Sequence, residues 1–200
     1  MDYNLDALAI GGNMVESEFI KTAMAAASEV LVPPLLIKPH SVLLYQITVD
    51  NRLSISVNPR DPKRGHSAFQ TDLCIFEEVE MGIAIPRVVM EFKPDFSTHD
   101  ILIYSAKARK HKHVYPYLRY GLVMGDRSTL PGRFFTHNEG LDFAVAAGSY
   151  QNNRLQEFFT TLISAEVATS RRLEDIGFGE HQPRYCRSEL MVEENSGKIV

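Results

Sequence analysis

An acid and a base lie at the end of a strongly apolar strand. Residues 85–93, IPRVVMEFK, have the composition of a strand, and alternation along it places Val89, Glu91 and Lys93 on one face. At ~3.3 Å per residue, the Glu91 carboxylate and the Lys93 ammonium lie within about 7 Å along that strand. Burying such a charge costs several kcal/mol unless something compensates it, and a metal ion would do so for a carboxylate.

A second acid, Asp72, interrupts another strand-like run, residues 68–76, AFQTDLCIF. If the two strands pair, Asp72 and Glu91 converge on one cation. Two carboxylates with water and phosphate oxygens suit Mg²⁺, for which Mn²⁺ is a substitute. The cation would lower the pKa of a bound water, and Lys93 would orient that water or stabilise the transition state. This pattern predicts hydrolysis of phosphodiester bonds.

Asp72 is followed, after 18 residues, by Glu91-Phe92-Lys93 on the next expected strand. This arrangement resembles the PD-(D/E)xK nuclease superfamily of restriction endonucleases and repair nucleases. The resemblance covers roughly residues 14–124. It implies that Asp72 and Glu91 are catalytic metal ligands, that Lys93 is the catalytic lysine, and that the backbone carbonyl of Phe92 joins the metal shell.

Two further positions bear on this resemblance. Thr71 stands where the family motif commonly has proline. Many members also carry an acid on the first helix, and Glu16 faces the apolar side of the helix expected over residues 14–31. Glu16 is therefore a candidate additional catalytic residue, and the alternative is that it completes a capping box with Asn13.

Basic residues flank the expected strands although the net charge of the chain is −4. Residues 101–125 contain no Asp or Glu, and the loop 58–66 contains a single acid. Contacts of such side chains with phosphates give sequence-independent, salt-dependent affinity for DNA. A solvated helix face is the alternative. The predicted DNA-binding residues are Lys63, Arg64, Lys107, Arg109, Lys110 and Lys112.

These residues must be positioned by alternating helices and strands. Helices are expected over residues 14–31, 98–113 and 152–175, the second begun by a Ser97–Asp100 capping box. A hairpin over 41–57 is expected to turn at Asp50-Asn51. Residues 77–82 are expected to form a loop or the end of another hairpin. Further strands are expected over 68–76, 85–93, 117–124, 133–137 and 141–147. The fold class is α/β, a restriction-endonuclease-like mixed central sheet flanked by helices, with one domain over 1–177 and a polar tail over 178–200.

Composition and missing motifs narrow the class of protein. Two cysteines exclude a disulfide scaffold and a four-cysteine metal site. The sequence shows no signal peptide, membrane-spanning run or ATP-binding loop, so we expect a cytoplasmic protein without a nucleotide cofactor. His111-Lys112-His113 lacks the partner spacing of a zinc site, and we expect these residues to face solvent. Five aromatic residues after the helix expected over 98–113 either pack in the core or on an edge strand, which is the commoner role, or stack on bases: Tyr115, Tyr117, Tyr120, Phe134 and Phe135.

The leading hypothesis is a metal-dependent DNA endonuclease, resembling a type II restriction enzyme or a subunit of one. A homodimer is expected, because cutting two strands is simplest with two sites. One alternative is a repair or recombination nuclease acting on ends or single strands. The other is a DNA-binding subunit on the same scaffold that does not catalyse a reaction.

Overall fold

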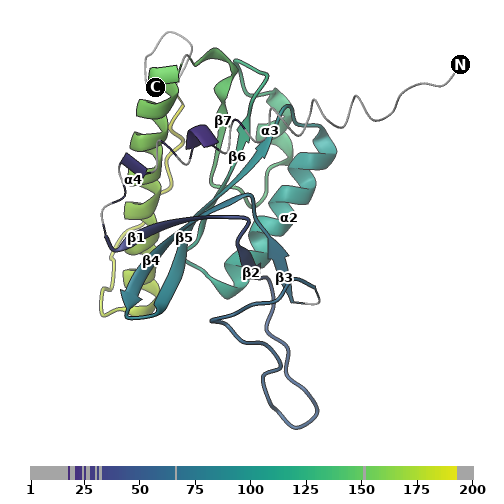
Figure 1. The fold of residues 1–200 in the computed structure, drawn as a ribbon, viewed down its shortest axis with the longest axis vertical. Coiled ribbons are helices and arrows are strands. Elements are labelled where there is room, and N and C mark those ends of the chain that lie inside the picture. The colour runs from purple at the N-terminus through teal and green to yellow at the C-terminus, as the bar shows by residue number, and fades with distance from the viewer. Residues whose placement is uncertain are drawn as a thin grey trace, which may run out of the picture.

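A mixed five-stranded sheet forms the centre of the computed structural model (Figure 1). Its strand order is β1 (Leu35–Pro39), β4 (Leu73–Glu80), β5 (Ile83–Lys93), β6 (Arg119–Met124) and β7 (Phe143–Ala146). Strand β4 is antiparallel to both of its neighbours, β1 and β5, whereas β5, β6 and β7 run parallel to one another. The structure describes residues 18, 21–23, 25, 28–29, 31, 33–65, 67–150 and 152–192.

Helices cover both faces of this sheet (Figure 1). Helix α4 (Asn152–Phe178) packs through Leu155, Phe159 and Ile163 into one apolar cluster, which we call the α4-side core. Helix α2 (Thr98–Val114) contributes Ile101 and Ala108 to the opposite cluster, the α2-side core. The sheet is therefore buried on both faces, as a parallel crossover requires.

Smaller elements surround the central sheet. A separate two-stranded sheet pairs β2 (Val42–Leu44) with β3 (Ala68–Gln70) in antiparallel register. Helix α3 (Gly132–His137) and the 3₁₀ turn η1 (Ala147–Ser149) flank β7. None of the helices in the described part of the chain is both long enough and apolar enough to cross a membrane.

Strand β5 determines which way the candidate site residues point. Val88, Met90 and Phe92 belong to the α4-side core, while Val89 belongs to the α2-side core. Because side chains alternate along a strand, Glu91 shares the face of Val89 and lies beneath α2.

The expected α/β class, with a mixed sheet flanked by helices, is confirmed. The capping box of α2 is also confirmed, since Ser97 Oγ accepts from Asp100 N at 3.1 Å and Asp100 Oδ2 accepts from Ser97 N at 2.8 Å. The strands expected over 117–124 and 141–147 correspond to β6 and β7, and the helix expected over 152–175 corresponds to α4. The described residues between 18 and 29 are helical, and the remainder of the helix expected over 14–31, including Glu16, lies outside the described residues.

Several element predictions were wrong. Residues 133–137 form part of the helix α3 and not a strand, and Phe134 packs from this helix into the α2-side core. The segment is too short for its apolar residues to distinguish the helical period from the strand period. The 41–57 hairpin turns where expected, but its first strand pairs with β3, and its two sides form no ladder: they are joined by the isolated β-bridge Val49–Ile55 and a few hydrogen bonds around it. Strand β1 was missed, and β4 extends to Glu80, which leaves only a tight turn before β5.

Replacing Ser97 with alanine tests how much the capping box stabilises α2. Loss of the Ser97 hydroxyl leaves the Asp100 amide without its acceptor, so we expect the free energy of unfolding to fall by about 1 kcal/mol. Urea denaturation measures this change. Ser164→Ala, at an exposed site within α4, is the matched control and should cost nothing, because alanine is the better helix former. Equal stabilities of Ser97→Ala and the wild type would contradict the assignment.

Candidate functional site

Asp72 and Glu91 face each other across the β4–β5 pair. Asp72 lies in the short break between β3 and β4, directly before Leu73, which pairs with Met90. The next position outward in this antiparallel register brings Asp72 opposite Glu91. The Asp72 carboxylate is held there because its Oδ2 accepts a hydrogen bond from the backbone N–H of Phe92 at 2.9 Å.

The Glu91 side chain is enclosed by groups from two other elements, α2 and β6. Only 1% of the residue is exposed, and Lys107 Nζ on α2 donates to its Oε1 at 2.5 Å. The hydroxyl of Tyr120, on β6, donates to the same oxygen. Lys107 Nζ also donates to the backbone carbonyl of Gln70 at 2.7 Å. One ammonium group therefore connects α2, the end of β3 and the Glu91 carboxylate.

Burial raises the pKa of Glu91 to about 7, because the charged form loses its hydration. The ammonium of Lys107 opposes this shift, and the negative charge of Asp72 adds to it. A second positive charge near Glu91 would favour its ionised form.

Lys93 ends β5 on the same strand face as Glu91 and is half-buried. Lys93 also affects Asp100 at the start of α2. Burial raises the pKa of Asp100, but hydrogen bonds from Ser97 and the charge of Lys93 outweigh this effect and lower the pKa. Phe92 places its side chain in the α4-side core, and its backbone amide is bonded to Asp72.

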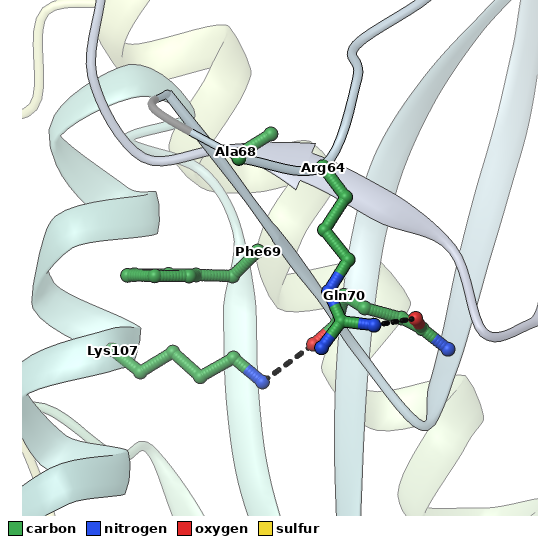
Figure 2. A pocket seen from close by; sticks show the side chains of 6 residues that line it. Arg64, Ala68, Phe69, Gln70 and Lys107 are labelled. Carbon is green, nitrogen blue, oxygen red and sulfur yellow. Dashed lines mark hydrogen bonds between the residues drawn. The ribbon is translucent and has the colours of Figure 1, made fainter.

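The predicted DNA-binding residues divide into two groups. Arg64 and Lys107 line, with Phe69 and Gln70, an open pocket of about 420 Å³ (Figure 2). Lys107 connects this pocket to Glu91 through its hydrogen bond. Arg64 Nη1 donates there to Gln70 Oε1 at 3.3 Å. The ammonium of Lys110 lies 4.8 Å from the centre of the Tyr45 ring.

The remaining basic residues form ion pairs with nearby acids. Arg109 bonds to Glu139 at 2.6 Å, and Lys63 bonds to Asp61 at 2.7 Å, both on the surface. Lys112 is more enclosed and contacts Asp142 Oδ2 at 2.6 Å and a backbone carbonyl at Gly140. Lys112 therefore ties the end of α2 to the segment before β7.

Tyr120 is a site residue that the sequence did not single out. The parallel register pairs Glu91 with Leu122, so Tyr120, two residues earlier, lies on the same face. Alternation within the strand expected over 117–124 carried the signal, but only the strand order shows that this strand neighbours β5. A buried tyrosine hydroxyl requires a partner, and here the partner is the Glu91 carboxylate.

His111 corrects one expectation. We expected it to face solvent, but it is fully buried next to the rings of Phe69 and Tyr120. Burial, with the nearby charge of Lys107, lowers the pKa of His111 to about 3, so it is neutral at physiological pH. The neighbouring His113 is exposed as expected, and Lys112 is partly buried.

Among the described residues, no three or more His, Cys, Asp or Glu side chains gather as a metal-binding group. The candidate site therefore rests on two carboxylates. No protein-family model matches the sequence, and no curated protein matches it. The chemistry of the site must accordingly be argued from its geometry.

Replacing Glu91 with glutamine tests the elevated pKa. As pH rises from the ordinary glutamate value of 4.5 to about 7, the unfolded carboxyl group ionises while the native one keeps its proton. Raising the pH through this window therefore lowers the free energy of unfolding, by about 3 kcal/mol in total. Urea denaturation across this range should show the loss in the wild type and in the exposed control Glu157→Gln, but not in Glu91→Gln. Parallel profiles for wild type and Glu91→Gln would contradict the assignment.

Proposed function

We propose that this protein is a metal-dependent nuclease that hydrolyses phosphodiester bonds in DNA at the Asp72–Glu91 site. The observation that carries the proposal is the opposition of these two acids at one end of the β4–β5 pair, where the side chain of Glu91 is buried. Two like charges held close together, one of them buried, are unfavourable unless a cation compensates them. Catalytic sites that bind divalent cations have this electrostatic character.

The donor set fits Mg²⁺ or Mn²⁺. Asp72 and Glu91 supply hard carboxylate oxygens, and the carbonyl of Phe92 is the third donor that the resemblance implies. Lys107 and Tyr120 both bond to Oε1 of Glu91, so Oε2 takes no part in these two contacts. When bound, the cation would supply positive charge to the reacting phosphate and a more acidic water.

The side chains around the acids suit an anionic substrate. Lys93 shares the face of Glu91 at the end of β5, and its ammonium group would orient the attacking water or stabilise the pentacovalent phosphate. Arg64 and Lys107 line the adjoining pocket, where an arginine fork fits a backbone phosphate. Cationic groups thus border the carboxylates on more than one side.

The order of elements also supports the resemblance to PD-(D/E)xK nucleases. An antiparallel β1–β4–β5 unit carries the acids at the start of β4 and the end of β5, and the basic helix α2 then leads to the parallel strand β6. Within this proposal, the enzyme is a cytoplasmic, type II restriction-type homodimer. Each protomer would then cut one strand of a duplex.

Cleavage of supercoiled plasmid tests the proposed function. We expect the wild type to cut in Mg²⁺ or Mn²⁺ and to be inactive in EDTA. Lys93→Ala and Glu91→Gln should reduce the cleavage rate by about 10²–10³-fold, because the first removes a positive charge at the reacting phosphate and the second removes a ligand of the cation that would supply one. Glu157→Gln, which changes an exposed glutamate on α4, is the matched control and should cut like the wild type.

The products distinguish the alternative functions. Discrete fragments indicate a restriction-type enzyme, and smearing indicates a nuclease without sequence preference. Retention of DNA without metal-dependent cutting indicates a binding subunit and contradicts the proposal. Wild-type cleavage rates in both Lys93→Ala and Glu91→Gln would show that the site lies elsewhere.

A further inference from the structure

Residues 45–65, which we call the arm, connect β2 to β3 and project away from the central sheet (Figure 1). The arm is a narrow ribbon closed by a tight turn, in which Asp50 Oδ1 accepts from the backbone N–H groups of Arg52 and Ser54. The bridge Val49–Ile55 and a 2.7 Å hydrogen bond between the side chains of Thr48 and Ser56 join its two sides. The returning side leads through β3 to Asp72.

The arm is positively charged in a chain that is acidic as a whole. It carries four basic residues, Arg52, Arg60, Lys63 and Arg64, against Asp50 and Asp61, whereas the whole chain has a net charge of −4. Both acids are engaged locally, Asp50 by the turn amides and Asp61 by Lys63. Within the described part of the chain, no acidic side chain pairs with Arg52, Arg60 or Arg64. The guanidinium groups of Arg52 and Arg60 are therefore available for an anionic partner, and that of Arg64 bonds to the neutral side chain of Gln70.

Large aliphatic side chains are also exposed on the arm. Ile47, Val49 and Ile55 are 50–61% exposed, and Leu53 at the tip is 86% exposed. Leu53 adopts a positive φ of 62°, which the Asp50 turn imposes. A folded segment that exposes four aliphatic side chains beside unpaired arginines presents a contact surface and not a core.

We propose that the arm inserts into a groove of duplex DNA and gives the enzyme a preference for double-stranded DNA and for the bases that it contacts there. This inference rests on the nuclease function proposed above. The major groove of DNA admits a two-stranded ribbon. Arginine bonds in bidentate fashion to guanine or to a phosphate, and aliphatic side chains contact the methyl group of thymine. Free arginines favour this partner over an apolar protein surface, against which they would lose hydration without gaining an anion.

The position of the arm fits a role in presenting substrate. Arg64 at its base lines the pocket beside Lys107, which bonds to Glu91. The chain then passes through β3 and reaches Asp72 after eight residues. A duplex held in its groove by the tip of the arm would therefore be connected through the base of the arm to both candidate metal ligands.

Equilibrium binding to a short duplex in EDTA tests the arm separately from cleavage. We expect Arg52→Gln to weaken duplex affinity about tenfold, from the loss of one bidentate contact. Leu53→Asn should weaken duplex binding more than binding to a single strand of the same sequence. The control, Arg172→Gln, removes an exposed arginine from α4 and should bind like the wild type. Unchanged thermal midpoints would show that the variants are folded.

Several outcomes would overturn the inference. Wild-type duplex affinity in both Arg52→Gln and Leu53→Asn, or a wild type that does not bind duplex, excludes the groove contact. Conversion of a dimer to a monomer by Leu53→Asn, with unchanged duplex affinity, would assign the arm to a second copy of the chain. Failure of the proposed function gives a different result. If duplex binding depends on the arm but the protein does not cut DNA with metal, the nuclease proposal is wrong and the role of the arm stands. If cleavage depends on Glu91 but duplex binding does not depend on the arm, the role of the arm is wrong and the nuclease proposal stands.

Discussion

Burial of the Glu91 carboxyl group is the interaction on which the rest of the site depends. An ionised carboxylate removed from water costs several kcal/mol, and here α2 and β6 offset that cost by supplying Lys107 and Tyr120. Removing one partner from such a buried pair commonly destabilises a protein by about 3–5 kcal/mol. The position of α2 over the sheet is therefore linked to the charge of one side chain, in addition to the contacts of the α2-side core.

The same ammonium group organises the surroundings of the acids. Lys107 also bonds to the carbonyl of Gln70, the last residue of β3, and the chain turns from there into Asp72. The pocket lined by Arg64 and Phe69 opens beside this contact. The Lys107 side chain therefore connects the opposed acids, the pocket and the base of the arm. A change at Lys107 would disturb all three. The proposed chemistry and the proposed DNA contact both depend on this arrangement.

The sequence predicted the parts of the fold that local patterns determine. The capping box of α2, the apolar stripe of α4 and the alternation of β5 each depend on nearby residues, and each was predicted. Three other features depend on contacts between distant residues and were not predicted: the pairing of β2 with β3, the helix α3 and the burial of His111. At the site, the opposition of Asp72 and Glu91 followed from two strand patterns. The Lys107 and Tyr120 contacts required the strand order and the packing of α2, which no local pattern contains.

The central claim is that Asp72 and Glu91 hold a common divalent cation. Anomalous diffraction from crystals soaked in Mn²⁺ tests this claim most directly, because the signal locates the ion without any reference to activity. We expect one anomalous peak between the two carboxylates, which disappears in crystals of Glu91→Gln. A peak elsewhere on the protein, or none between these acids at saturating Mn²⁺, would contradict it.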